Sequence, residues 1–319
     1  MTTLKDVAIE LKKHSKILIF CHNRPDGDTL GSAFALKYAL EQIEGKTADV
    51  VCAQSIPDKY APLDYLKGAY LPKEISSTYD CHISVDCASE MMLGDSYSIY
   101  AKNVNTINVD HHVSNERYAK LNYVEDRASC CEIIYGLINY LGREKTQSVV
   151  NSLLLGLVTD TGNFMHSNVT KETLQIASEL VGNGADLHKI SYAMFKNQKI
   201  ERAKLYAHVI DGVRFFENGK IAIISIFKSD FEKFSASQDM TEGFIDFPLS
   251  IEGVEVAVSI METKNNAYKI SLRSKGKVNV NEVASTFGGG GHVLASGCLI
   301  CGFYEDVKEK IIRAISINF

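Results

Sequence analysis

The sequence predicts an α/β protein with two domains, a doubly wound, largely parallel β-sheet followed by a smaller α/β unit. A length of 319 residues exceeds one average domain and is typical of two. In the first part of the chain, apolar strand-like segments alternate with helical patterns, as in parallel sheets covered on both faces. From about Gly212 the chain becomes rich in strand-like segments.

The elements of the first domain can be assigned in order from this alternation. Short apolar strands are predicted at 16–20, 48–52, 82–86 and 106–110. Helices are predicted around them at 4–13, about 32–43, about 131–141 and about 147–157. In such sheets the active groups gather in loops beyond the carboxyl ends of the strands, and several acidic residues here follow strand ends.

The second half begins with two helical patterns, at 171–181 and 187–209, the latter long enough to link domains. Strands follow at 221–226, 254–260 and 267–273, then the glycine run Gly288–Gly291 and a terminal helix from Glu305. We therefore expect a catalytic domain at 1–190, a helical linker at 191–211 and a substrate-binding domain at 212–319. We expect the active-site cleft to lie between the two domains.

Composition excludes several classes of function. The net charge is −5 without a block of basic residues, so no long nucleic acid is expected as a partner. No apolar run approaches the roughly 18 residues of a membrane-spanning helix, and the N-terminal segment is amphipathic rather than a signal peptide. We expect a cytoplasmic protein whose eight cysteines are reduced. Cys298 and Cys301 form a CxxC pair, which we interpret as part of a strand rather than a zinc site.

Residues of metal-ligand type occur in four short segments. They are His22-Asn-Arg-Pro-Asp26-Gly-Asp28, Val85-Asp86, Val109-Asp110-His111-His112 and Val158-Thr-Asp160. Pro25 and Gly27 are expected to keep the first segment from continuing as a helix. In the alternative interpretation, Asp28 or Thr29 caps a helix and Asp86 caps a strand end.

The charges of the acidic residues favour a centre with two metal ions. If Asp26, Asp28, Asp86 and Asp160 converge, their negative charges are strongly unfavourable in a cleft of low dielectric unless cations neutralise them. Two divalent cations would do so, and paired metals are the usual arrangement for phosphoester hydrolysis. Imidazole and carboxylate ligands without thiolate favour Mn²⁺, with Mg²⁺, Fe²⁺ and Co²⁺ as alternatives.

A second anion site is predicted near the C-terminus. Consecutive glycines at 288–291 let backbone amides approach a phosphate closely, and Arg273 offers a planar fork for bidentate contacts. His292 can donate a hydrogen bond to the same anion. The alternative interpretation of the glycine run is a flexible loop.

These motifs resemble a known family. HNRPDGD, SVD, VDHH and VTDTG resemble the ordered motifs of the DHH phosphoesterases, and FGGGGHVLASG is similar to the glycine-rich motif of the DHHA1 domain. The combination is most similar to the NrnA-like group of nanoRNases and 3′-phosphoadenosine 5′-phosphate (pAp) phosphatases, and the resemblance covers nearly the whole chain.

The resemblance implies a role for individual residues. His22 and Asp26 would hold one metal, Asp86 would bridge both, and the second metal would be held by Asp28, His111 and Asp160. Asp110 would support the histidine pair, and His112 would contact the scissile phosphate. The far phosphate of the substrate would be bound by Arg273, Ser274, Gly289, Gly290, Gly291 and His292. No role is assigned to Cys130-Cys131.

The resemblance implies a hydrolase that degrades short oligoribonucleotides (nanoRNA) to mononucleotides and removes the 3′-phosphate of pAp. One alternative is a phosphodiesterase of cyclic or linear dinucleotides, which needs almost the same site. An alternative from another class is a catalytically silent nucleotide sensor. Short RNA or nucleotide bisphosphates are the expected partners, no membrane is expected, and homodimerisation is left open.

Overall fold

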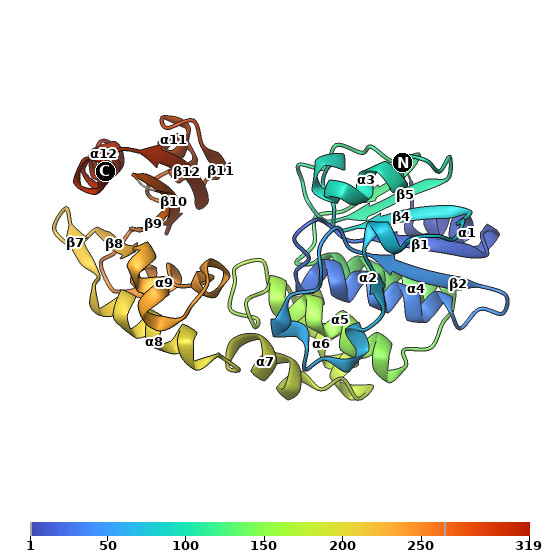
Figure 1. Cartoon of the computed structure of the whole chain (residues 1–319). Coiled ribbons are helices and arrows are strands. Elements are labelled where there is room, and N and C mark those ends of the chain that lie inside the picture. Colours follow the sequence, from blue (N-terminus) through green and yellow to red (C-terminus); the bar gives the residue numbers. More distant parts are fainter. Residues whose placement is uncertain (1, 265) are drawn as a thin grey trace. The chain divides into compact units, whose positions relative to one another are not determined.

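The computed structural model of the chain describes residues 2–264 and 266–319. Within it the chain forms two compact units, one extending to Asn197 and the other beginning at Gln198. Both are α/β units built on one sheet each, as the sequence predicts (Figure 1). None of the described helices is long and apolar enough to cross a membrane.

The sheet of the first unit is parallel throughout, with the strand order β3-β2-β1-β4-β5-β6. Its strands are β1 (Lys16–Phe20), β2 (Thr47–Val51), β3 (Ala69–Tyr70), β4 (Cys81–Val85), β5 (Thr106–Asp110) and β6 (Leu121–Val124). The direction in which strands are added reverses between the neighbours β1 and β4. Ligands of open α/β sheets bind beyond the carboxyl ends of the strands at such a point.

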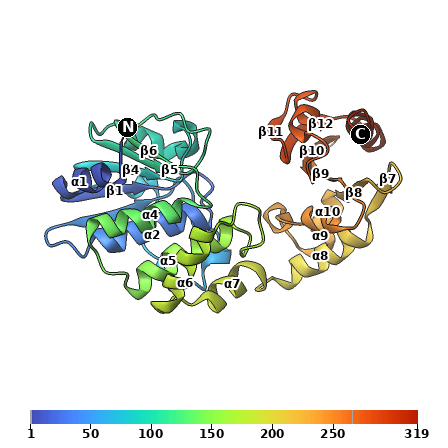
Figure 2. The same cartoon turned by 180° about the vertical axis from the view of Figure 1, so that it is seen from behind.

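The two faces of this sheet are covered unequally. One face packs against α1 (Leu4–Lys13), α2 (Gly27–Leu40) and α4 (Cys130–Leu141), and α5 (Gln147–Asp160) joins the same core (Figures 1 and 2). The short α3 (Tyr97–Tyr100) and neighbouring 3₁₀ turns cover the other face. Two further helices, α6 (Lys171–Gly182) and α7 (Leu187–Phe195), pack against α5.

Glycines allow α2 and α5 to approach each other closely. A Cβ atom added at Gly31 would lie 2.4 Å from the carbonyl oxygen of Ser152, and one added at Gly27 would lie 2.3 Å from Oγ1 of Thr159. From the other helix, a Cβ at Gly156 would lie 2.5 Å from Oδ1 of Asp28. This close contact holds the start of α2, with Asp28, against the end of α5, with Asp160.

The start of α2 differs from the prediction, which placed the helix from about Ser32. The helix begins at Gly27, because the side chain of Asp26 accepts hydrogen bonds from the amides of Asp28 (3.0 Å) and Thr29 (3.1 Å). Residues 22–26 lie outside the helix as expected, but Gly27 is its first residue and Asp28 lies in its first turn. The cap is Asp26, whereas the alternative interpretation assigned it to Asp28 or Thr29.

The prediction of one continuous helix at 187–209 was wrong. The structure has α7 ending at Phe195 and a separate α8 (Ile200–Asp211). The intervening residues Lys196–Lys199 are all exposed and polar, so they have no apolar side chain to bury in a helical interface. The amide of Asn197 instead closes the end of α7 with a hydrogen bond of 2.8 Å to the carbonyl oxygen of Tyr192.

The second unit contains a mixed sheet with the strand order β11-β12-β10-β9-β8-β7, in which only the β8–β9 pair is parallel. Its strands are β7 (Arg214–Phe216), β8 (Ile221–Ile226), β9 (Val256–Lys264), β10 (Ala267–Ser274), β11 (Gly290–His292) and β12 (Ala295–Cys301). One face packs against α11 (Val280–Ser285) and α12 (Tyr304–Ser316). On the other face, α8 and α9 (Lys228–Phe234) form a second cluster, and α10 (Asp246–Ser250) lies against β8 and β9.

The contact between α2 and α5 yields a stability prediction. We expect Gly31→Ala to lower the free energy of unfolding by about 1–3 kcal/mol, because the new methyl group meets backbone atoms that cannot move aside. The matched control is Gly182→Ala at the end of α6, where an added Cβ meets no atom within 4 Å. Urea unfolding of both variants measures the difference, and equal stabilities would contradict the packing argument.

Candidate metal centre

The candidate metal ligands come from five elements that meet at the carboxyl edge of the first sheet. His22 follows β1, Asp86 follows β4, and His111 and His112 follow β5. Asp28 lies in the first turn of α2, and Asp160 is the last residue of α5. The site therefore lies where the strand order reverses, at the position expected for a ligand site.

Within this site the side chains form two groups of three that could each hold a metal ion. The first consists of His22, Asp26 and Asp86, and the second of Asp28, His111 and Asp160. In the first group, Nε2 of His22 lies 3.4 Å from Oδ1 of Asp26 and 3.7 Å from Oδ2 of Asp86. In the second, Nε2 of His111 lies 3.8 Å from Oδ2 of Asp28 and 3.6 Å from Oδ2 of Asp160.

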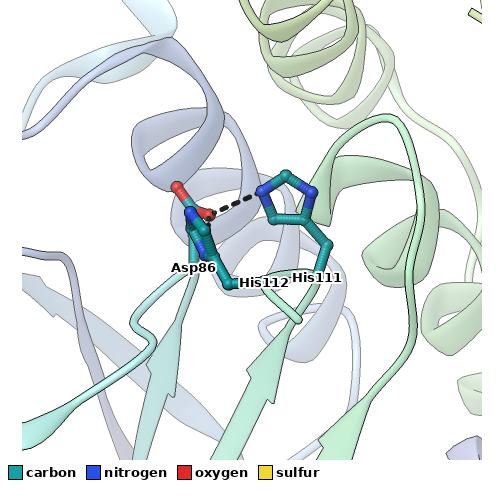
Figure 3. A group of neighbouring side chains, drawn as sticks. All are labelled: Asp86, His111 and His112. Atoms are coloured by element: carbon teal, nitrogen blue, oxygen red, sulfur yellow. Dashed lines mark ion pairs between the residues drawn. The ribbon is translucent and has the colours of Figure 1, made fainter. Parts of the chain in front are cut away.

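Asp86 lies between the two groups. While its Oδ2 faces His22, its Oδ1 lies 3.3 Å from Nε2 of His111 and 3.7 Å from Nδ1 of His112 (Figure 3). Asp86, His111 and His112 form a third group with metal-ligand spacing. The backbone of Asp86 has a φ of 57°, a left-handed conformation that costs about 1–2 kcal/mol for most residues. This turn aims the carboxylate at both histidines.

Asp28 is fixed by the N-terminus of α4. Its Oδ2 accepts a hydrogen bond of 2.6 Å from the amide of Cys130, and its Oδ1 accepts one of 3.0 Å from the amide of Cys131. Amides at a helix N-terminus stabilise negative charge because they lack partners within the helix and lie at the positive end of its dipole. The sequence assigned no role to Cys130-Cys131, and the structure gives one to their backbone. Both thiols are buried.

The two histidines are held by different partners. Nδ1 of His111 lies 3.0 Å from the carbonyl oxygen of Arg127, to which it donates when protonated, so Nε2 faces the carboxylates. Nδ1 of His112 lies 2.8 Å from Oδ1 of Asp110, which leaves its Nε2 directed away from that carboxylate. The other oxygen of Asp110 accepts a hydrogen bond of 2.6 Å from the side-chain amide of Asn115. Such partners fix the orientation and tautomer of an imidazole.

The electrostatics of the site fit divalent cations. Burial, reinforced by the charge of Asp28, raises the pKa of Asp86 well above its usual value and that of Asp160 to about 8. Burial alone would lower the pKa of His111, but the carboxylates of Asp86 and Asp28 outweigh it and raise that pKa to about 11. In addition, Oδ1 of Asp86 is buried and accepts no hydrogen bond from the described residues. A cation would supply the missing partner and relieve the repulsion.

The predicted phosphate-binding residues of the second unit lie on neighbouring strands. Arg273 of β10 pairs with Ala295 of β12, which pairs with His292 of β11, so Arg273 and His292 share one face of the sheet. This is the face opposite the buried Leu272. Gly290, Gly291 and His292 are exposed.

Ser274 and Gly289 are placed differently. Ser274 follows the strand alternation onto the opposite face from Arg273, where it is buried and its hydroxyl accepts a hydrogen bond of 3.0 Å from the amide of Gly276. A Cβ at Gly289 would lie 2.2 Å from the carbonyl oxygen of Gly297, so this glycine permits close backbone packing. The structure therefore brings together Arg273 and His292, but its strand alternation separates Ser274 from them.

Some contributors to the site were not identified from the sequence. Asn115 was missed because a single asparagine in a loop has no pattern that links it to Asp110. The carbonyl group of Arg127 and the amides of Cys130 and Cys131 are backbone groups, whose role no side-chain motif reveals. The CxxC pair lies in strand β12 as expected, with Cys298 buried and Cys301 exposed, and all eight cysteines are free.

Comparison with known sequences identifies two domains. The sequence model of the DHH family, N-terminal domain, matches residues 16–159, and that of the DHHA1 domain matches residues 218–317. The bifunctional oligoribonuclease and PAP phosphatase NrnA of Thermus thermophilus is 29% identical over 94% of this chain and 89% of its own length. The probable bifunctional oligoribonuclease and PAP phosphatase NrnA of Streptococcus mutans is 30% identical over 93% of each chain.

A solved structure is also similar to this chain over nearly its whole length. The crystal structure of an exopolyphosphatase-related protein from Bacteroides fragilis superimposes with a TM-score of 0.91 at 26% sequence identity. The match covers 98% of this chain and 95% of that one.

The crowded carboxylates predict that metal binding depends on pH. Raised pKa values mean that the metal-free site holds protons near neutral pH, and a cation must displace them. We therefore expect the affinity for Mn²⁺ to increase as the pH rises from about 6 to 8, with proton release measurable in weak buffer. Asp86→Asn should lose bound metal in elemental analysis, whereas the exposed control Asp64→Asn should retain it. Retention of metal by Asp86→Asn would exclude a bridging role.

Proposed function

Because this chain belongs to the DHH phosphoesterase family and carries a DHHA1 domain, we propose that it hydrolyses short oligoribonucleotides to mononucleotides and removes the 3′-phosphate of pAp. The family is metal-dependent and the chain is a phosphoesterase, a hydrolase of phosphate ester bonds. The observation that carries the proposal is the pair of ligand groups that meet at Asp86. The names of the full-length relatives support the substrate class.

In this proposal the site would take two divalent cations, preferably Mn²⁺. His22, Asp26 and Asp86 would hold one of them, and Asp28, His111, Asp160 and the shared Asp86 would hold the other. When bound, such ions supply Lewis acidity toward water and toward the oxygens of the phosphoryl group. The two histidines and four carboxylates provide the mixed nitrogen and oxygen donors that suit Mn²⁺, while Mg²⁺, Fe²⁺ and Co²⁺ accept a similar set.

His112 and Asp110 would act on the leaving group. Asp110 accepts the hydrogen at Nδ1 of His112, which would leave Nε2 free to face the reacting phosphate. A proton donated from Nε2 to the leaving ester oxygen would allow the P–O bond to break without expelling an alkoxide. Asn115 keeps Asp110 in place through its hydrogen bond to the second carboxylate oxygen.

The second unit would bind a second phosphate of the same substrate. Arg273 and His292 share one sheet face, and Gly290 and Gly291 beside His292 are exposed, so a phosphate could approach their backbone closely. We propose that residues 1–190 carry out the reaction, that 191–211 link the domains and that 212–319 bind the distal phosphate. A substrate with two phosphates then gains binding energy that positions the reacting one. Long nucleic acids are not proposed as substrates, and the proposed location is cytoplasmic.

A direct assay tests the substrate class. We expect the Mn²⁺-loaded protein to hydrolyse labelled RNA dinucleotides and pAp, and to lose this activity in excess chelator. His112→Ala should lower kcat by about 10²–10⁴-fold while the metal content stays unchanged, because it removes a proton donor rather than a ligand. Hydrolysis of cyclic di-AMP or linear pApA alone would favour the dinucleotide phosphodiesterase. Binding of these nucleotides without turnover would favour the sensor.

The role of the second unit is tested by comparing substrates. Arg273→Ala should reduce kcat/KM for dinucleotide and pAp roughly ten- to a hundredfold, because a charge-assisted contact to phosphate is lost. This factor corresponds to about 1.5–3 kcal/mol of transition-state stabilisation. It should leave turnover of bis(p-nitrophenyl) phosphate unchanged, since that ester has no second phosphate. The control is Lys269→Ala, an exposed cation four residues before Arg273 in β10. Equal losses on both substrates would show that Arg273 supports the fold instead.

A further inference from the structure

A short backbone segment, residues 127–131, holds two of the three members of the second ligand group. One of its carbonyl oxygens lies 3.0 Å from Nδ1 of His111, and two of its amides donate hydrogen bonds of 2.6 and 3.0 Å to Asp28. The third member, Asp160, comes from another element, the end of α5. The geometry of the group therefore depends on what holds the end of α5 against residues 127–131.

The side chain of Asn168 joins these two parts of the chain. Its Nδ2 donates hydrogen bonds of 3.1 Å to the carbonyl oxygen of Ala128 and of 3.2 Å to that of Asp160. Carbonyl oxygens only accept, so the nitrogen of the Asn168 amide faces both of them, and its two hydrogens suffice for two partners. The carbonyl group of Asp160 is one of the last four of α5, which have no partner within the helix.

The loop that presents Asn168 has an unusual backbone. Gly162, Asn163 and Phe164 follow one another with φ angles of 54°, 59° and 63°. This left-handed conformation is unfavourable for residues other than glycine, and such strain is typical of functional sites. The loop then returns to the end of α5, where the side chain of Asn168 meets the carbonyl group of Asp160.

Other contacts hold the base of this loop in its conformation. The amide of Asn163 donates a hydrogen bond of 2.7 Å to the carbonyl oxygen of Val158, and its side-chain oxygen accepts one of 2.9 Å from the hydroxyl of Ser191. The amide of Phe164 donates one of 3.0 Å to Oγ1 of Thr161, and the Phe164 side chain packs against the core of the first unit. The base of the loop is therefore fixed independently of the two hydrogen bonds that Asn168 makes.

We propose that Asn168 is a positioning residue for the second metal ion. It joins the segment that supports Asp28 and His111 to the end of α5, and so keeps the carboxylate of Asp160 at the spacing that the ion requires. Asn168 acts through Asp160 and need not touch the ion. The inference rests on the two-metal centre of the proposed function.

The first ligand group has a different support. Asp26 accepts hydrogen bonds from two amides at the start of α2, and His22 and Asp86 follow strands of the sheet. The loss of the Asn168 amide should therefore weaken the binding of one ion and spare the other. A residue that merely stabilises the fold would not separate the two ions in this way.

The experiment is titration of the metal-free full chain with Mn²⁺, with the free ion measured by electron paramagnetic resonance. Asn168→Leu keeps the size and neutrality of the side chain and removes both donors, and the position is exposed, so the variant should remain folded. We expect two Mn²⁺ ions to bind to the unaltered protein. In the variant one should bind as before and the other roughly 10–100-fold more weakly, the usual effect of removing a group that orients a ligand.

Thermal unfolding provides a second measurement. A ligand that binds the folded state raises Tm according to its affinity, so Asn168→Leu should show a smaller increase in Tm on addition of Mn²⁺. The matched control is Asn183→Leu, the same change at an exposed asparagine whose Nδ2 donates to the carbonyl oxygen of Glu179 at the end of α6. It should bind both ions as the unaltered protein does.

Three results would overturn the inference. The first is unchanged Mn²⁺ binding in Asn168→Leu while the unaltered protein binds two ions, which would leave the proposed metal centre intact. The second is equal weakening of both ions, or the same weakening in Asn183→Leu, since either indicates a general loss of structure. The third is an unaltered protein that binds no pair of Mn²⁺ ions, which would contradict the proposed centre itself.

Discussion

Mutual repulsion of buried carboxylates around Asp86 is the constraint on which the first unit depends. Asp28 and Asp86 are almost completely inaccessible to solvent. The charge of Asp28 raises the pKa of both Asp86 and Asp160. In a medium of low dielectric, such groups cannot all be ionised without positive charge between them. In the metal-free site a protonated His111 supplies part of this charge. Metal ions in the proposed centre would displace that proton and supply the positive charge instead. The surrounding fold keeps the groups together against this repulsion.

Three features of the fold hold the acids in place. Adjacent strands β1 and β4 end at the point where the strand order reverses, which brings His22 and Asp86 to one edge. The N-terminus of α4 neutralises part of the charge of Asp28 through two amides. Small residues let α2 approach α5, so that Asp28 and Asp160 meet. All three features are formed by the backbone of helices and strands. Such elements are rigid, so they can hold the side chains of the site in a fixed geometry.

The segment from Arg127 to Cys131 supports the metal centre through its backbone. Its carbonyl group at Arg127 orients His111, and its amides at Cys130 and Cys131 hold Asp28. One short stretch of chain thus orients a histidine and a carboxylate of the metal centre with backbone groups alone.

The sequence alone determined the α/β class, most strands of both sheets and the identity of the chemistry. The spacing of apolar residues reveals strands and helices, because the side chains that face the core recur with the period of the element. Clustered Asp and His residues at strand ends indicate metal ligands. Only the tertiary structure decided what brings the groups together: the positive φ of Asp86, the orientation of His112 by Asp110 and Asn115, and the amides that hold Asp28. These depend on contacts between residues far apart in the chain and on backbone groups that every residue carries. Local sequence patterns record neither these long-range contacts nor the backbone groups. For the same reason, the end of helix α7 at Phe195 and the separation of Ser274 from Arg273 became visible only in the fold.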